Sequence, residues 1–209
     1  MASIGDRYKD GGVGTHLYRW LRLERRGLRG LAAHFPAEGR IVDLGCGAGL
    51  LAHVLVEDAP GREVLGVDHD AFRVAALNVS AEGLPIEGVE ADLADFEIPA
   101  CQGIALVDVL HFLDAQAQER LLDRCVAALE PGGVLVLRDP DPDARLKFDL
   151  AKLQERASTG FGLSHARLGH FRRGPEWSFQ LRLRGLQTRV LPLARLSPFA
   201  DRTIVGRKR

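Results

Sequence analysis

A glycine turn between an apolar strand and an apolar helix is the feature that most constrains this chain. The β-branched run Ile41–Leu44 predicts a buried strand, and apolar residues at helical spacing after Gly49 predict a helix. Gly45, Gly47 and Gly49 lie between them. Glycine lets the backbone approach a ligand where a Cβ atom would collide, and a helix start offers unpaired N–H groups. The pattern predicts a nucleotide-type cofactor site in an α/β fold.

The glycine turn leaves the class of cofactor open. Dinucleotide-binding domains use G-x-G-x-x-G/A followed by an acidic residue roughly 20 residues later. Here Leu50 occupies the sixth position of that pattern, whereas Asp68 ends the next predicted strand, Val64–Val67. Asp68 suits ribose hydroxyls in either class. An NAD(P)-binding oxidoreductase therefore stays an alternative at this point.

Five segments, in order, resemble the motifs of class I S-adenosylmethionine-dependent methyltransferases, from about Gly39 to the C-terminus. They are VDLGCGAGL (42–50), GVDHD (66–70), EADLADF (90–96), VDVLHFL (107–113) and LEPGGVLVLRD (129–139). DVLHFL and the ending SPFADRTIVGRKR also resemble bacterial methyltransferases of polyketide-like or aryl-polyene pathways. The resemblance implies a Rossmann-like, doubly wound α/β fold with a mostly parallel seven-stranded sheet and a C-terminal antiparallel strand pair. It also implies S-adenosyl-L-methionine as cofactor and S-adenosyl-L-homocysteine as product.

Strands alternate with helices along the chain, which is typical of a parallel sheet with right-handed crossovers. Further strands are predicted at Ile86–Ala91, Ile104–Val109 and Val134–Leu137, the last after a turn at Pro131–Gly133. Helices are predicted at Thr15–Leu31, from Leu50 to about Asp58, at Ala71–Ala81 capped by Asp70, after Asp114, at Arg145–Arg156 and at Glu176–Arg184. Ser158–Pro175 is interpreted as a long loop or lid, and Leu186–Leu193 with Arg202–Arg207 as an antiparallel pair. We expect an N-terminal helical cap over residues 1–38 and a methyltransferase domain over 39–209, in one domain overall.

The carboxyl ends of parallel strands share one edge of the sheet, where ligands of such sheets bind. Four carboxylates at this edge suit a sulfonium and an ammonium better than a pyrophosphate. The resemblance implies that Asp68 binds the ribose, that Asp92 and the backbone of Leu93 bind the adenine, and that Asp43 lies near the ammonium. The other predicted cofactor-binding residues are Gly45, Cys46, Gly47, His69, Asp108 and Val109, the last two beside the sulfonium. Turn chemistry or helix capping is the alternative for Asp92 and Asp108, and Asp68→Ala is expected to remove most cofactor affinity with the fold intact.

The acceptor side is predicted from residues after the fourth and fifth strands. His111 is the candidate general base, needed only if the acceptor loses a proton during attack; packing under the following helix is the alternative. Arg138 and Asp139 are predicted to bind a polar group of the acceptor, with ion pairing inside the protein as the alternative. Tyr8 and Trp177 are predicted to line a cap over the pocket, with ordinary packing as the alternative.

Charge is strongly segregated although the net charge is zero. Residues 165–209 contain eleven Lys or Arg against two Asp or Glu, whereas residues 31–164 contain ten against twenty-three. Attraction between these segments is one interpretation, and a basic rim for an acidic partner is the other. We predict a small-molecule acceptor, with an acceptor carried on an acidic acyl carrier protein as a variant. Nucleic acid is disfavoured because no aromatic and basic platform is evident, and a non-catalytic binding module is a further alternative.

Cysteine usage and hydropathy predict a cytoplasmic protein. Cys46, Cys101 and Cys125 are an odd number with no C-x-x-C pair, which suits a reducing compartment. The sequence has no run of about 18 apolar residues and no secretory h-region. No metal site is predicted, because Pro140 and Pro142 interrupt the acidic residues that alternate from Asp139 to Asp143.

Overall fold

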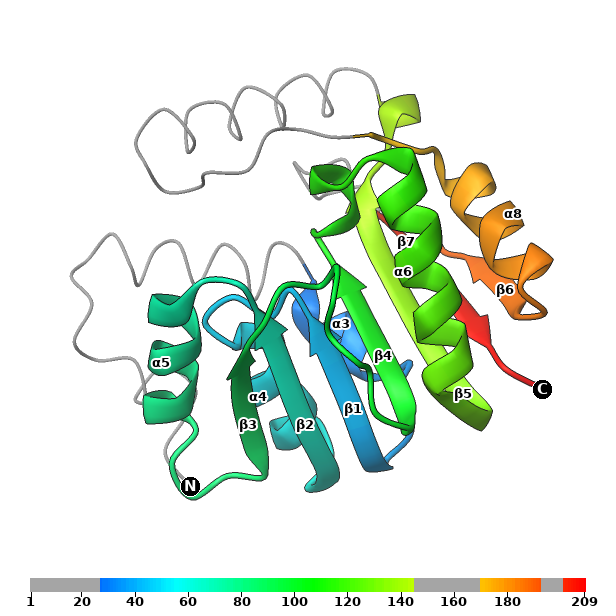
Figure 1. The fold of residues 1–209 in the computed structure, drawn as a ribbon. Coiled ribbons are helices and arrows are strands. Elements are labelled where there is room, and N and C mark those ends of the chain that lie inside the picture. The colour runs from blue at the N-terminus through cyan, green and yellow to red at the C-terminus, as the bar shows by residue number, and fades with distance from the viewer. Residues whose placement is uncertain (1–26, 145–169, 193–200) are drawn as a thin grey trace.

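A twisted seven-stranded sheet organises the chain (Figure 1). The computed structural model describes residues 27–144, 170–192 and 201–209. The strand order is β3-β2-β1-β4-β5-β7-β6. The bounds are β1 Glu38–Leu44, β2 Gly61–Asp68, β3 Ile86–Glu90, β4 Cys101–Val107, β5 Leu129–Pro140, β6 Gln187–Val190 and β7 Asp201–Arg207. The first five strands are parallel, β7 runs antiparallel to β5, and β6 antiparallel to β7, which confirms the predicted sheet.

Helices cover both faces of this sheet (Figure 1). Their bounds are α3 Leu28–Ala32, α4 Leu50–Asp58, α5 Ala71–Ser80, α6 Ala115–Ala128 and α8 Gly174–Leu183, with short 3₁₀ turns η2 Leu110–Phe112 and η3 Pro142–Ala144. Successive strand residues point to opposite faces. Ile41 and Val134 therefore pack in one apolar cluster with α3 and α4, whereas Val42 and Leu135 pack in the other with α6 and α8.

Two predicted helix caps are present. The Asp70 carboxylate accepts hydrogen bonds from the backbone N–H groups of Phe72 and Arg73, and α5 begins at Ala71. The Asp114 carboxylate accepts from Ala117 N–H in the same way, and α6 begins at Ala115. Such side chains accept hydrogen bonds from N–H groups that have no partner inside the helix. The starts of α5 and α6 could therefore be predicted from the sequence.

Other predicted boundaries are wrong or lie outside the described residues. The fourth strand was predicted as Ile104–Val109 but is Cys101–Val107, because Asp108 adopts a left-handed backbone conformation, φ 60°, that ends the extended run. Pro131–Gly133 lies within β5 rather than before it. Pro175 lies in the first turn of α8 instead of in the predicted lid, because a proline is tolerated where the N–H has no helical partner. The predicted helix Arg145–Arg156, most of Thr15–Leu31 and most of the predicted lid lie outside the described residues.

Arg62, in β2, fastens the base of the sheet to its flanking segments. Its guanidinium, in a side chain 2% exposed, donates to the Asp58 carboxylate and to four backbone carbonyls, those of Ala32, Phe35, Pro36 and Leu55, at 2.7–3.2 Å. These carbonyls close α3, the link into β1 and the end of α4. This arginine therefore fixes the frame that carries the glycine turn at the opposite end of β1.

The strand order changes direction between β1 and β4: β2 and β3 follow outward from β1 on one side, and β5 follows from β4 on the other. The loops after β1 and β4 therefore lie side by side at the carboxyl edge of the sheet. Within the described ranges, no helix is long and apolar enough to cross a membrane.

Candidate cofactor and acceptor site

The glycine turn after β1 is built as a ligand cradle. Its first two amides, those of Gly45 and Cys46, donate to the carbonyl of Val67 at the end of β2, at 2.7 and 3.0 Å. Gly45, Gly47 and Gly49 all have positive φ, between 55° and 78°. A Cβ atom added to Gly47 would meet no described atom within 4 Å, so the turn is open at that point. At Gly45 and Gly49 a Cβ would lie 2.1 Å from side chains of the protein, so these two glycines permit close packing instead.

Asp68 holds the open side of this turn. Its Oδ2 accepts from Gly47 N–H at 2.8 Å and its Oδ1 from Asp70 N–H at 3.0 Å, and the residue is 5% exposed. An ionised carboxylate has about four acceptor positions, so two positions remain for hydroxyl donors such as those of a ribose. The contacts also revise the expectation for Asp68→Ala, because removing the carboxylate would free the backbone of the turn. The exposed imidazole of His69 lies 3.5 Å from Asp68 Oδ1.

Cys46 and Asp43 complete the base of the cradle. The Cys46 sulfur lies over Gly66, where an added Cβ would come within 2.9 Å of it. Burial, together with the nearby Asp43 and Asp68 carboxylates, raises the pKa of the Cys46 thiol. Asp43, at the end of β1, is 2% exposed. Cys46 is thus a neutral packing residue of the turn, and the contact of its backbone with a cofactor stays a prediction.

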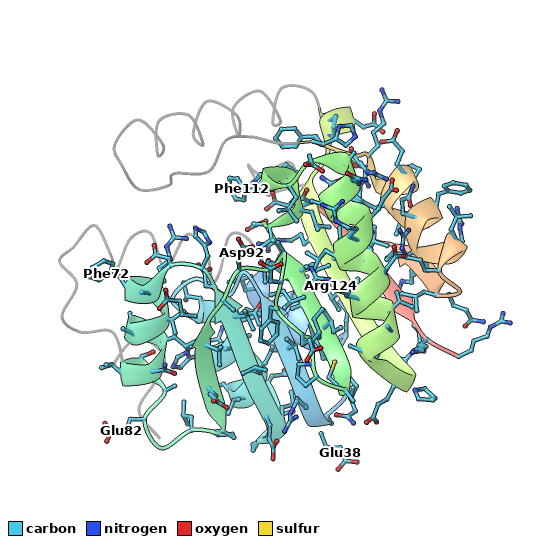
Figure 2. The ribbon with its side chains drawn as sticks, in the orientation of Figure 1. Glu38, Phe72, Glu82, Asp92, Phe112 and Arg124 are labelled. Atoms are coloured by element: carbon cyan, nitrogen blue, oxygen red, sulfur yellow. The ribbon has the colours of Figure 1, made fainter. Side chains whose placement is uncertain are left out.

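Asp92 makes the turn contacts that were weighed as its alternative. Its Oδ1 accepts from Ala94 N–H at 2.8 Å, and its carbonyl accepts from Phe96 N–H at 2.9 Å. Arg124 of α6 holds the same loop by donating to the carbonyls of Leu93 and Phe96. Figure 2 shows Asp92 at the carboxyl edge of the sheet, opposite Glu38 at the other end. The loop is therefore held at the carboxyl edge of the sheet, and adenine recognition by Asp92 and Leu93 stays a prediction.

Asp108 and Arg138 form a buried ion pair across β4 and β5. Arg138 Nη2 lies 2.7 Å from Asp108 Oδ2, and the two side chains are 3% and 7% exposed. The structure thus shows the ion pairing that was the alternative for Arg138, because its guanidinium faces Asp108, and acceptor binding by Arg138 stays a prediction. Asp108 is likewise directed at an internal cation, and its predicted place beside the sulfonium stays a prediction.

His111 and Asp139 form a second buried pair at the same edge. His111 Nδ1 lies 2.7 Å from Asp139 Oδ1, and each side chain is 1% exposed. The His111 ring is stacked on Phe171 with centroids 5.6 Å apart and a 9° interplanar angle, and it contacts Phe112 at 4.1 Å. Burial raises the pKa of Asp139, and His111 opposes that shift. Asp139 is thus a partner of the candidate base, which is the ion pairing weighed as its alternative, and acceptor binding by Asp139 stays a prediction.

Comparison with known proteins agrees with this geometry. A family model described as a methyltransferase domain matches residues 41–133. Over these residues the chain matches a methyltransferase domain, and its fold is that of solved S-adenosylmethionine-dependent methyltransferases, such as the one from Archaeoglobus fulgidus, with a TM-score of 0.69 at 15% identity over 93% of this chain and 99% of that one. S-adenosylmethionine is the cofactor of that class, and the open Gly47, the spare acceptor positions of Asp68 and the acidic strand ends fit it.

Relatives of the methyltransferase domain differ in what their names say they act on. The chain is 40% identical over 134 residues to trans-aconitate 2-methyltransferase of Paracidovorax citrulli, covering 60% of this chain and 49% of the relative. It is 38% identical over 104 residues to ribosomal RNA small subunit methyltransferase C of Pseudomonas aeruginosa, covering 47% and 31%. The chain thus spans half or less of these relatives. The solved structure of the pyocyanin biosynthetic protein PhzM superposes with a TM-score of 0.72 at 16% identity, over 97% of this chain and 60% of that one, which shows the fold.

Trp177 belongs to the core of the methyltransferase fold, so its predicted place in a cap over the acceptor is wrong. It is 1% exposed and packs with α6 and the sheet, and the Arg172 guanidinium lies 5.4 Å from its ring centroid. Tyr8 lies outside the described residues. Two residues of this region were not predicted from the sequence: Phe171, and Gln118, whose amide donates to the carbonyls of Leu110 and His170. The Gln118–His170 and His111–Phe171 contacts join residues more than 50 positions apart, and no local pattern marks them.

Internal ion pairs account for part of the charge segregation. Four arginines of the C-terminal segment pair with acidic residues of the middle segment at 2.7–3.3 Å: Arg172 with Glu119, Arg173 with Asp143, Arg184 with Asp123 and Arg202 with Asp141. Lys208 donates to carbonyls at the end of α6, including Val126 at 2.8 Å. Attraction between the segments is therefore part of the methyltransferase fold itself. The alternating acidic residues from Asp139 to Asp143 each face a histidine or an arginine.

Proposed function

We propose that this chain transfers a methyl group from S-adenosylmethionine to a small-molecule acceptor. The observation that carries the proposal is the pairing of Asp68 with Gly47: a buried carboxylate, with acceptor positions to spare, fixes the one open glycine of the turn. When bound, the cofactor supplies a methyl group already activated by its sulfonium. The protein then contributes chiefly position and orientation.

The carboxyl edge divides into two halves under this proposal. Asp68 accepts from the ribose hydroxyls, the glycine turn lies along the methionine part with Asp43 near its ammonium, and the Asp92–Leu93 loop borders the adenine. The other half, beyond β4, carries the His111–Asp139 pair. The reacting methyl group therefore lies between these halves, at the reversal of strand order between β1 and β4.

His111 is our candidate for the general base. Asp139 accepts from Nδ1–H, which fixes the tautomer and leaves Nε2 as the basic nitrogen. The acceptor is then a compound whose attacking group, such as a hydroxyl, loses a proton on methylation. Because His111 is 1% exposed beneath Phe171, it takes a proton only from an acceptor that displaces that ring or enters beside it.

Ion pairs formed within the chain by basic side chains favour a small acceptor over one bound to an acidic carrier protein. Four of the eleven basic residues that suggested a rim for an acidic carrier are engaged in ion pairs within the chain. The similarity to trans-aconitate 2-methyltransferase also supports a small organic acceptor. We further propose that residues 1–38 form a cap on a methyltransferase domain of residues 39–209.

Turnover with methyl-labelled S-adenosylmethionine and a panel of small hydroxyl-bearing and carboxyl-bearing acceptors tests the function. Transfer to a small acceptor supports it, and transfer confined to carrier-bound or RNA acceptors contradicts the small-molecule assignment. His111→Asn then tests the base: we expect kcat to fall by about 10²–10⁴ with cofactor affinity unchanged. A fall of less than about tenfold, with lost stability alone, would make His111 a packing residue.

A further inference from the structure

The turn after β4 has an unusual backbone at Asp108. Among the described residues, Asp108 is the only non-glycine residue with positive φ, at 60°. Aspartate tolerates this left-handed region better than most side chains, yet the conformation still has to be held by its surroundings. Because Asp108 lies at the carboxyl edge between the two halves of the site, what holds it bears on the site's geometry.

Arg138 holds this turn from two sides. Its carbonyl accepts from Asp108 N–H at 2.9 Å, and its Nη2 donates to Asp108 Oδ2 at 2.7 Å. Both side chains are nearly fully buried. Backbone and side chain of a single residue in β5 thus fix the backbone and the side chain of Asp108. A lysine would place one ammonium there without the planar fork.

The next residue carries this constraint to the glycine turn. Val109 is 9% exposed, and its Cγ2 would lie 2.1 Å from a Cβ atom on Gly45. The Gly45 amide in turn donates to Val67 at the end of β2. A continuous set of contacts therefore leads from Arg138 through Asp108 and Val109 to the cradle.

We propose that Arg138 is a positioning residue for the cofactor: it fixes the Asp108 turn, so that Val109 supports the glycine turn. The inference rests on the proposed function in that the glycine turn is taken to bind S-adenosylmethionine. It assigns to Arg138 an effect on cofactor affinity in place of the acceptor contact predicted from sequence.

Hydrogen exchange of the Gly45 and Cys46 amides in the full chain without cofactor is the first test. We expect Arg138→Gln and Asp108→Asn each to speed exchange of these amides by about tenfold or more, because support of the turn is lost. Arg184→Gln, which removes a more exposed arginine–carboxylate pair between the end of α8 and Asp123 of α6, is the control and is expected to leave these two amides unchanged. Unchanged exchange in both site variants would overturn the proposal, whether or not the chain proves to be a methyltransferase.

Cofactor and acceptor constants give the second test. We expect Arg138→Gln to weaken S-adenosylhomocysteine binding about tenfold while the acceptor KM stays within about twofold, and the Asp108→Asn/Arg138→Gln double variant to be no weaker than either single one. A raised acceptor KM with unchanged cofactor affinity would instead make Arg138 an acceptor-binding residue. If Arg138→Gln fails to fold, Arg138→Lys keeps the charge without the fork and is expected to give a smaller change in the same direction.

Discussion

Replacement of Arg62 by methionine should destabilise the fold far more than replacement of an exposed arginine. The change keeps most of the aliphatic stem and removes a buried guanidinium that donates to the Asp58 carboxylate and to four backbone carbonyls. A buried polar group that loses its partner costs about 1–3 kcal/mol. Water relieves part of this cost, and the Asp58 carboxylate, which is 43% exposed, is solvated once its partner is removed, so about 1 kcal/mol remains for each of the four carbonyls. We therefore expect Arg62→Met to lower the free energy of unfolding by about 4 kcal/mol.

Urea unfolding followed by circular dichroism measures this loss. With a urea m-value of about 2 kcal/mol/M, a change of about 4 kcal/mol lowers the midpoint by about 2 M. Arg40→Met is the control, because Arg40 is 49% exposed and lies 3.8 Å from Glu63; we expect it to cost less than about 1 kcal/mol. Equal effects of the two variants, or a loss below about 1 kcal/mol for Arg62→Met, would refute the view that Arg62 fastens the sheet.

Three further predictions, the first with a control variant, test other parts of the structure. Asp68→Asn should weaken cofactor binding at least about tenfold in calorimetry and also lower the Tm, because the NH₂ group of the new asparagine would face a backbone N–H group. Asp114→Ala is the control: it removes only a helix cap and should lower the Tm without changing cofactor affinity. Asp139→Asn tests the raised pKa of Asp139. That group stabilises the fold below its unfolded pKa, about 3.9, and loses this contribution as pH rises through the folded pKa, so the stability of the variant relative to wild type should increase as pH rises above the unfolded pKa. A stability difference that stays constant with pH in urea titrations would contradict the burial argument. Lys208→Met should cost about 1–3 kcal/mol in the same assay, because Lys208 caps the end of α6; no loss would leave the basic C-terminus available for a partner.

Local rules were enough to predict the sheet and the location of the site. Strands β1, β2 and β4 each contain a short apolar run, and caps such as Asp70 and Asp114 fix helix starts within a few residues. Once the strands are parallel, their carboxyl ends must share an edge, so the glycine turn and Asp68 were expected together. The hydrogen bond between Gly47 N–H and the Asp68 carboxylate agrees with that expectation.

Side-chain partners at the same edge could not be predicted, because they depend on the exact end of each strand. Strand β4 ends at Val107, two residues before its predicted end, so Asp108 lies in a left-handed turn and forms an ion pair with Arg138. His111 and Asp139 were both predicted as site residues with separate roles, whereas the structure pairs them. The position of Trp177 was predicted wrongly because the sequence pattern around an aromatic residue in a short helix is the same whether its side chain faces a pocket or the core.

A crystal structure of the chain with S-adenosylhomocysteine tests the central claim most directly. We predict the ribose hydroxyls within hydrogen-bond distance of the Asp68 carboxylate, with the amino-acid part of the ligand lying over Gly47. A ligand bound at another surface, with the Asp68 carboxylate making only its backbone contacts, would contradict the account.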